Sequence, residues 1–320
     1  MTDKDILNAK VALLSGGWSD EKEISLASGR ACEKALLEAG FTHIDFIDVS
    51  ETGFASKLEA GHYDVAFIAM HGRYGEDGCV QGLLEMLHIP YTFSGVLSSS
   101  MSAEKNIAKT FYQQAQIPVP KGYEVAAGDK IDEKLIDEIV CDLGLPIFVK
   151  PACNGSSYGV TKVVEKQQLK EAIDHALEGG DRALIEQCIT GVEITVPVIG
   201  NNEPVALPII EIVMDSEFYD LKVKYEPAAL HHVCPARLCE DVYKKAQEYA
   251  VAAHKALECA GASRSDFIVT DEGVPVILET NSIPGMTESS LMPDSARHAG
   301  IEFPELCRKF IEFALERFEK

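Results

Sequence analysis

The sequence predicts a mixed α/β protein that has a parallel sheet in its N-terminal part and more than one domain. Residues 10–15 and 65–70 form short, continuous apolar runs, and a helical pattern lies between them. Continuous apolar strands separated by helices are typical of a parallel sheet whose two faces are both covered. The length of 320 residues exceeds that of a usual single domain, so we expect two domains or a compact three.

The N-terminal elements define where a ligand should bind. The strand at 10–15 stops at Gly16-Gly17, and a helix is expected over about 20–39, ending at Gly40. The strand at 65–70 runs into the polar loop 71–78, and a helix follows to about residue 87. Because ligands of parallel sheets bind beyond the carboxyl ends of the strands, both loops should border a ligand site.

The remaining elements suggest a smaller middle unit and a larger C-terminal one. A helix over about 102–116 precedes Ile117-Pro118-Val119-Pro120, where proline predicts a linker. The middle unit contains strands at 147–150, 159–164 and 183–186, with a helix at about 166–177. The last third contains strands at about 192–199 and 205–214, a helix at about 240–260, a hairpin and a C-terminal helix. We therefore divide the chain into residues 1–95, 96–187 and 188–320.

Composition and charge exclude several classes of partner. Hydrophobic residues make up 46% and charged residues 25%, which is typical of globular proteins. Lys plus Arg is 29 against 51 for Asp plus Glu, so the formal charge is −22. Such a surface repels nucleic acids and anionic membranes, and we expect neither as a partner. Any phosphate site must then be a local group of cations and backbone N–H groups.

The N-terminus and the cysteines indicate the compartment. The first ten residues carry charges where a signal peptide needs an apolar core, and no run of 18 apolar residues occurs, so the sequence predicts a cytoplasmic protein. The nine cysteines are scattered without a Cys-x-x-Cys pair, which favours reduced thiols over disulfides or zinc. We assign them no chemistry from the sequence.

The most informative segment is a predicted hairpin around Asp271-Glu272-Gly273, whose two flanks are apolar. A two-residue loop, Glu272-Gly273, places Asp266 opposite Glu279, with Asn281 on the same face. Facing carboxylates destabilise a sheet unless a cation lies between them, and oxygen donors suit Mg²⁺, which usually also binds phosphates. A four-residue loop would shift this register, and both carboxylates can instead mark strand ends in solvent.

A second group of residues suits a nucleotide. Lys150 ends an apolar strand and opens a loop of small residues that includes Gly155, so N–H groups, hydroxyls and an ammonium can surround phosphates. The loop is not a Walker A motif, and a plain hairpin turn remains the alternative. Lys105 is a second phosphate cation or a solvated lysine. Glu186 and Glu193 suit amino and ribose hydroxyl groups, or they are simply exposed.

Four separated segments then fit one known pattern in order, and they span essentially the whole chain. They are residues 16–25, 71–78, 150–159 and 279–287. Together they closely resemble the D-alanine:D-alanine ligases of the ATP-grasp superfamily. The resemblance implies a substrate-binding N-terminal domain (1–95), a central ATP-grasp subdomain (96–187) and a C-terminal catalytic domain (188–320), with the nucleotide held between the last two.

The resemblance also implies an activity. Enzymes of this family phosphorylate the carboxylate of one D-alanine with ATP, and the amine of a second D-alanine attacks the acyl phosphate. The products are D-alanyl-D-alanine for peptidoglycan and the cell wall, ADP and phosphate. ATP and two Mg²⁺ ions, with Mn²⁺ as a substitute, are implied, as is a homodimer. The alternatives are a ligase for D-lactate or another second substrate, and a nucleotide-binding regulator without turnover.

The resemblance assigns the following residues to metal and nucleotide. The Mg²⁺ ligands are Asp266, Glu279 and Asn281. The ATP contacts are Lys105, Lys150, Gly155, Ser157, Glu186 and Glu193. Lys224 adds a cation near the transferred phosphoryl group.

Further residues are implied at the amino-acid end. Glu21 holds the first ammonium with His71 nearby, and Ser290 binds the second carboxylate. Arg264 and the Gly285 N–H stabilise the tetrahedral oxyanion. The residues that join Glu21 in closing the site are Ser156 and Tyr225. The chain departs from the common family residues at Tyr158, usually a small aliphatic residue, and at Trp18, often arginine or threonine. Tyr225 goes with dipeptide rather than ester formation in the family.

Overall fold

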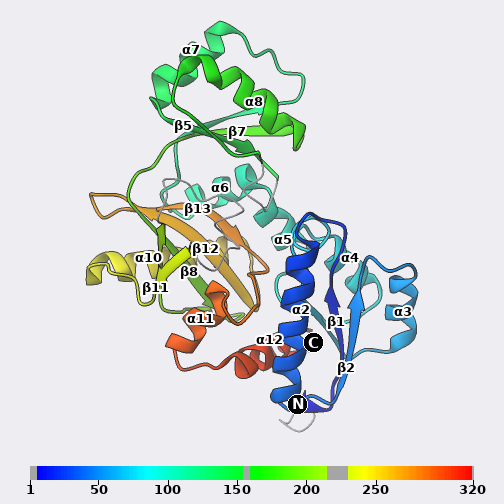
Figure 1. Ribbon diagram of the computed structural model, residues 1–320. Coiled ribbons are helices and arrows are strands. Elements are labelled where there is room, and N and C mark those ends of the chain that lie inside the picture. The colour runs from blue at the N-terminus through cyan, green and yellow to red at the C-terminus, as the bar shows by residue number, and fades with distance from the viewer. Residues whose placement is uncertain (1–5, 154–158, 215–229, 319–320) are drawn as a thin grey trace.

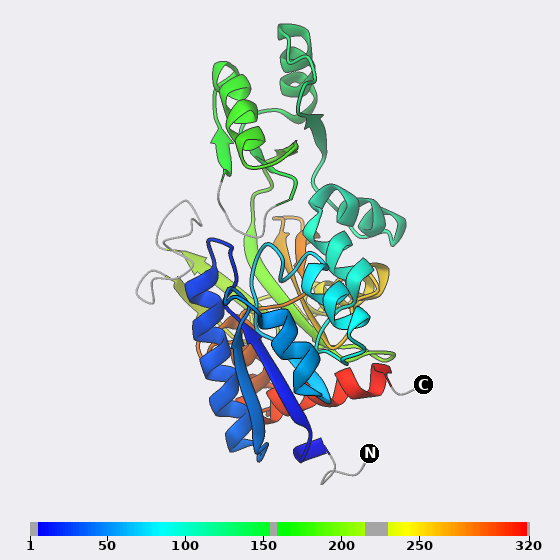
Figure 2. The same cartoon turned by 90° about the vertical axis from the view of Figure 1, so that its right-hand side faces the viewer.

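Three β-sheets organise the part of the protein that the computed structural model describes, residues 6–153, 159–214 and 230–318 (Figure 1). One sheet belongs to each of the N-terminal, middle and C-terminal parts of the chain. The middle part projects from the top of the molecule in Figures 1 and 2, above the N-terminal and C-terminal parts. The predicted mixed α/β fold with an N-terminal parallel sheet is confirmed.

The N-terminal sheet is parallel and has the strand order β2-β1-β3. Its strands are β1 (Lys10–Ser15), β2 (His43–Asp48) and β3 (Val65–Ile68), and its helices are α2 (Lys22–Glu38), α3 (Phe54–Gly61) and α4 (Cys79–Met86). The two predicted strands are β1 and β3, which are almost wholly buried. Strand β2 was not predicted from the sequence, because this edge strand is only partly buried and lacks a continuous apolar run.

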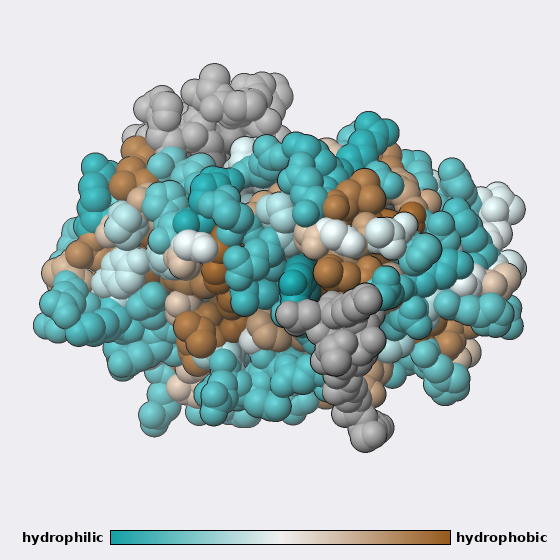
Figure 3. All heavy atoms as spheres, turned by 90° about the horizontal axis from the view of Figure 1, so that it is seen from below, coloured by the Kyte–Doolittle hydropathy of each residue, from teal (hydrophilic) through white to brown (hydrophobic). Residues whose placement is uncertain are grey.

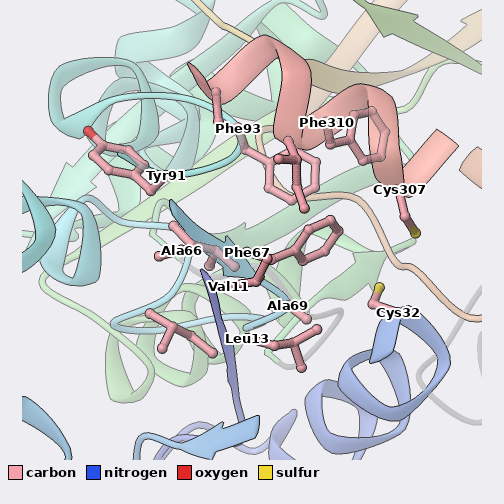
Figure 4. Packing of buried hydrophobic residues seen from close by; sticks show 14 of the residues in the cluster. Val11, Leu13, Cys32, Ala66, Phe67, Ala69, Tyr91, Phe93, Cys307 and Phe310 are labelled. Carbon is pink, nitrogen blue, oxygen red and sulfur yellow. The ribbon is translucent and has the colours of Figure 1, made fainter. Parts of the chain in front are cut away.

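The last helix, α12 (Phe303–Phe318), packs on this N-terminal sheet and its helix α2, far from it in sequence. The ring of Phe93 lies 5.9 Å from that of Phe67 in β3 and 5.0 Å from that of Phe310 in α12 (Figure 4). The beginning and the end of the chain therefore share one hydrophobic core.

The middle sheet is antiparallel, with the order β4-β7-β5-β6. Its strands are β4 (Gly122–Ala126), β5 (Ile147–Pro151), β6 (Thr161–Val163) and β7 (Arg182–Gln187). Its helices are α7 (Glu133–Leu143), the short 3₁₀ turn η1 (Lys166–Gln168) and α8 (Leu169–Glu178), and α7 and α8 lie above the sheet in Figure 1. These elements have a hydrophobic core of their own.

The C-terminal sheet is also antiparallel, with the order β11-β10-β8-β12-β13, and β9 pairs with β8. Its strands are β8 (Val192–Ile199), β9 (Val205–Ala206), β10 (Ile210–Met214), β11 (Leu230–Val233), β12 (Ala262–Val269) and β13 (Pro275–Asn281). Its helices are α10 (Glu240–Ala256) and α11 (Leu291–His298). The strand predicted over 205–214 is two strands, because Pro208 between them has no N–H for a ladder.

Two helices occupy the place of the single helix predicted over 102–116. They are α5 (Val96–Ala103) and α6 (Lys105–Gln114), and Glu104 between them is extended at φ −95° and ψ 96°. The break allows the Lys105 N–H to donate to the Ala152 carbonyl at 3.0 Å, which joins α6 to the loop after β5. Met101, Ala108 and Tyr112 pack in the core of the C-terminal sheet. The division at residues 95 and 187 remains a proposal, since α5, α6 and α12 pack across it.

The face of the molecule that is seen from below is largely hydrophilic (Figure 3). Seen from below in Figure 3, hydrophilic side chains cover most of the molecule, and the hydrophobic side chains form separate patches. Among the described residues, no helix combines the length and the apolar character needed to cross a membrane.

Candidate active site

A cavity of about 940 Å³ lies where the three parts of the chain meet. Its walls come from the loops after β1 and β3, the junction of α5 and α6, the loop after β5, the turn before β7 and the end of β13. The lining residues that matter for chemistry are Glu21, Gly72, Glu76, Lys105, Glu279 and Asn281. The expectation that the loops after the two parallel strands border a ligand site agrees with this geometry.

Glu21 stands at the N-terminal end of α2 and is 8% exposed. Its carboxylate lies against Gly72, because a Cβ atom on that glycine would come within 2.7 Å of Glu21 Oε2. Gly72 also has a φ of +70°, so two independent constraints favour glycine there. A buried carboxylate in this wall is suited to a cationic group such as an ammonium.

His71 lies behind the wall of the cavity and does not line it. It is 5% exposed, its Nε2 is 2.9 Å from Ser28 Oγ, and its Nδ1 is 3.4 Å from Glu76 Oε1. The Ser19 hydroxyl donates to the His71 carbonyl at 2.8 Å. These contacts tie the two loops together, so His71 can orient Glu76, which does line the cavity.

The hairpin of β12 and β13 has the predicted pairing of Asp266 with Glu279, but for a different reason. The predicted two-residue loop is wrong, because the last pair before the turn is Val269 with Pro275. The longer turn alone would shift the pairing of the strands by one residue. A register shift between Asp266 and Phe267 shifts it back. Asp266 and Glu279 therefore face each other as expected.

Arg264 pairs with Asn281 two residues further along, which places both on the same face as the carboxylates. The Arg264 guanidinium donates to both Asp266 oxygens, from Nε at 3.1 Å and from Nη2 at 2.9 Å. Thr195 in β8 donates to Asp266 Oδ1 at 2.5 Å, and the Asn281 amide is 3.4 Å from Oδ2. Asp266 is thus held by three neighbours, and its position is well defined.

Lys105 and Glu279 form an ion pair across the cavity wall, with 2.8 Å between Nζ and Oε2. Burial lowers the pKa of the Lys105 ammonium, but the Glu279 carboxylate more than offsets this, and the net pKa is raised above its usual value. Lys105 is therefore a permanent cation beside the hairpin carboxylates at physiological pH. This charge suits an anionic ligand.

Glu186 in β7 is buried between two lysines. Its Oε2 is 2.7 Å from Lys150 Nζ in β5, and its Oε1 contacts Lys109 Nζ in α6. Burial, together with the nearby Lys105 ammonium, lowers the pKa of Lys150 to about 8. Burial also lowers the pKa of Lys109 well below its usual range, with Lys150 and Lys105 adding to the effect. Three lysines thus gather around two carboxylates at the junction of the three parts.

Three other predicted residues, Glu193, Gly285 and Ser290, lie in β8 and in the segment before α11. Glu193 is half-buried in β8 and shares the face of Thr195, which touches Asp266. Gly285 and Ser290 are adjacent, since a Cβ atom on Gly285 would be 3.2 Å from Ser290 Oγ. Ser290 stands at the N-cap of α11, but its hydroxyl bonds the Thr287 N–H at 3.0 Å instead of capping the helix. Neither Gly285 nor Ser290 is among the residues that line the cavity.

Five predicted site residues lie outside the described residues, as does the unusual Tyr158. They are Gly155, Ser156, Ser157, Lys224 and Tyr225. Trp18, the other departure, lines the cavity and is 56% exposed, with its ring 5.7 Å from that of Tyr74.

Lys109, Thr195 and Glu76 were not predicted from the sequence as members of the site. Lys109 follows Lys105 by four residues on α6, so helical spacing places both on one face and was an available signal. Thr195 follows Glu193 by two residues in a strand, which also places them on one face. Their partners lie in other parts of the chain, and local sequence carries no sign of those contacts.

Comparisons with known proteins agree with one another. Residues 47–94 match the family described as D-ala D-ala ligase N-terminus, and residues 111–312 match D-ala D-ala ligase C-terminus. The chain is 42% identical over 312 residues to the D-alanine–D-alanine ligase of Desulforamulus reducens, covering 96% of this chain and 99% of the relative. It is 43% identical over 313 residues to that of Pelotomaculum thermopropionicum, covering 97% and 98%.

Solved structures give the same result. The D-alanine–D-alanine ligase of Bacillus anthracis complexed with ATP superposes with a TM-score of 0.83 at 33% identity, covering 98% of each chain. The VanG D-Ala:D-Ser ligase of Enterococcus faecalis gives a TM-score of 0.81 at 30% identity, covering 96% of this chain and 99% of that one. These matches confirm the predicted ATP-grasp architecture, and the chain belongs to the D-alanine–D-alanine ligase family.

Proposed function

We propose that this protein uses ATP to join two D-alanine molecules into D-alanyl-D-alanine, releasing ADP and phosphate. The observation that carries the proposal is that one cavity contains Glu21 at one wall and Lys105, Glu279 and Asn281 at another. An ammonium-binding carboxylate and a phosphate-binding group of cations thus border the same space. The reaction would supply a peptidoglycan precursor in the cytoplasm, and we include a homodimer in the proposal.

The N-terminal loops bind the first D-alanine in this scheme. Glu21 accepts the ammonium group, and His71 keeps Glu76 and the loop in place through its contacts with Ser28 and Glu76. The substrate carboxylate then points toward Lys105. Because both loops follow strands of the same parallel sheet, their relative position is fixed by the fold.

The hairpin residues fit Mg²⁺. Asp266, Glu279 and Asn281 offer oxygen donors from one face, and the two carboxylates face each other with Lys105 and Arg264 balancing their charge. Bound Mg²⁺ would neutralise phosphate charge and act as a Lewis acid toward the transferred phosphoryl group. We include two Mg²⁺ ions, replaceable by Mn²⁺, in the proposal.

The nucleotide lies between the middle and C-terminal sheets. Lys105 and Lys150 hold phosphate oxygens, while Glu186 and Glu193 accept hydrogen bonds from the adenine amino group and the ribose. Lys109 keeps Glu186 in place from the other side. Gly155, Ser157 and Lys224 complete the phosphate contacts by family resemblance.

Two displacements complete the reaction. A carboxylate oxygen of the first D-alanine attacks the γ-phosphorus, ADP leaves, and an acyl phosphate forms. The uncharged amine of the second D-alanine attacks the acyl carbon, phosphate leaves with that carboxylate oxygen, and the proton lost by the nitrogen goes to the departing phosphate. The Arg264 guanidinium and the Gly285 N–H stabilise the oxyanion, and Asp266 orients Arg264 through two hydrogen bonds.

The remaining roles concern the second substrate and closure. Ser290 binds the second carboxylate, in a turn that its bond to Thr287 holds in place. Ser156 and Tyr225 close the site with Glu21, which protects the acyl phosphate from water. A ligase with D-lactate or D-serine as second substrate is the nearest alternative, because a D-Ala:D-Ser ligase is among the similar structures.

The test is phosphate release by the purified protein with ATP and Mg²⁺. D-alanine, L-alanine, D-alanine with D-lactate, and D-alanine with D-serine are compared, and product masses are recorded. We expect D-alanine alone to stimulate release and to give the dipeptide mass. ATP binding without release under any of these conditions would instead support a regulator that has lost turnover.

A further inference from the structure

We propose that Cys234, Asp294 and His298 form a site for a divalent transition-metal ion, with Zn²⁺ as the best match. The site lies where the end of β11 meets α11, and it includes none of the residues assigned to the ligase reaction. It does not depend on the proposed function. Its consequence is a metal-dependent link between the edge of the C-terminal sheet and the helix that follows Ser290.

The geometry brings three different ligand types together. One ligand atom each from Cys234, Asp294 and His298 lies within 4.8 Å of the other two. Asp294 and His298 are four residues apart on α11, so both point from one helix face. Cys234 directly follows β11, the edge strand of the sheet. The fold, and not a local motif, creates this cluster.

The spacing is close to that of a tetrahedral zinc site. Zn–S and Zn–N bonds of about 2.3 and 2.0–2.1 Å place the ligands of a tetrahedron about 3.3–3.7 Å apart. The three ligand atoms lie within 4.8 Å of one another, so small side-chain adjustments bring them to these distances. Cys234 and Asp294 are partly buried and His298 is exposed, so an ion can enter from solvent.

Neighbouring groups support the ligands. His232 Nε2 is 3.0 Å from Asp294 Oδ2, which fixes the carboxylate as the outer partners of metal ligands usually do. His298 Nδ1 is 2.9 Å from the Asp294 carbonyl and 3.8 Å from Asp294 Oδ1, so the ring lies beside the carboxylate. Arg297 bonds Asp294 Oδ1 at 3.0 Å and also the Glu288 carbonyl at 3.1 Å. If Asp294 Oδ1 binds a metal instead, Arg297 still donates its hydrogen bond to the Glu288 carbonyl.

The donor set separates this site from the Mg²⁺ site. A thiolate, an imidazole and a carboxylate favour Zn²⁺, whereas Mg²⁺ requires hard oxygen donors. Three protein ligands leave one position for water. Excess Mg²⁺ should therefore not displace the ion. The absence of a Cys-x-x-Cys motif excluded only a zinc site built from closely spaced cysteines.

The test measures Zn²⁺ binding to the tag-free, full-length protein by equilibrium dialysis with excess Mg²⁺. We expect one Zn²⁺ per chain, and with Co²⁺ a thiolate-to-cobalt charge-transfer band. Cys234→Ser and His298→Asn should abolish the band and weaken Zn²⁺ binding at least about 100-fold. His232→Asn should weaken it about 10–100-fold, the usual effect of losing an outer partner.

Matched controls are Cys239→Ser, which removes an exposed cysteine nearby, and His175→Asn, which removes an exposed histidine elsewhere. Both should bind Zn²⁺ like the unaltered protein. Unchanged binding in Cys234→Ser would overturn the proposal, as would a wild-type protein that binds no Zn²⁺. Circular dichroism identifies a variant that fails to fold. In that case the cobalt band of the unaltered protein is the test, and the absence of this band overturns the proposed metal site.

Discussion

Glu279→Gln separates the structural role of the hairpin carboxylate from its chemical role. The change keeps the size of the side chain and removes its charge, which leaves Lys105 without its 2.8 Å partner. The gross attraction at that distance is about 6 kcal/mol at an effective dielectric constant of about 20. Desolvation offsets most of it, and the side chains are 10% and 24% exposed, so we expect a net cost of about 1–3 kcal/mol.

The double variant Glu279→Gln, Lys105→Met tests this reasoning, since it removes both members of the pair. We expect it to regain most of the lost unfolding free energy, measured by denaturant titration, because the buried ammonium that lost its charged partner is removed as well. Turnover at saturating ATP should fall about 10²–10³-fold in the single variant, the usual effect of losing one group that stabilises developing charge. It should not recover in the double variant. Recovery of turnover together with stability in the double variant would refute the assignment of Glu279 to the chemistry.

Three further predictions address other parts of the site and fold. Because the pKa of Lys150 is about 8 instead of the usual 10.5, the ammonium is lost above pH 8. kcat/KM for ATP should then fall as pH rises through 8. The Lys150→Arg variant stays charged and should not show this decline. An identical decline in the variant would argue against Lys150 as the group whose charge is lost. Arg264→Lys should lower kcat about 10²–10³-fold because lysine cannot make both bonds to Asp266; a rise in KM alone would indicate a binding role instead. Asp132→Ala should cost about 1 kcal/mol of unfolding free energy, because the Asp132 side chain caps α7 by accepting from the Leu135 N–H at 3.1 Å; kcat should be unchanged, and a lower kcat would show that α7 takes part in the reaction.

The sequence predicted elements and residues whose signal is local. Buried strands such as β1 and β3 are continuous apolar runs, and the opposition of Asp266 and Glu279 follows from the alternation of a hairpin. The details of that hairpin were not predictable, because a longer turn and a register shift offset each other. The predicted pairing was therefore correct although its assumed loop was wrong.

Contacts between distant segments could not be predicted from local patterns. Glu186 was expected to meet a nucleotide, and its position between Lys109 and Lys150 depends on how α6 packs against the middle sheet. The division of the single predicted helix at Glu104 depends on the loop after β5, which accepts the Lys105 N–H. Family resemblance, and not a local pattern, supplied the roles of the site residues.

The most direct test of the central claim follows the oxygen atoms of the substrate. The protein is incubated with ATP, Mg²⁺ and D-alanine labelled with ¹⁸O in both carboxylate positions, and the products are analysed by mass spectrometry. If an acyl phosphate forms in the cavity between Glu21 and Lys105, each released phosphate carries one ¹⁸O and the dipeptide keeps one in its peptide carbonyl. Unlabelled phosphate, or label in AMP, would contradict the account.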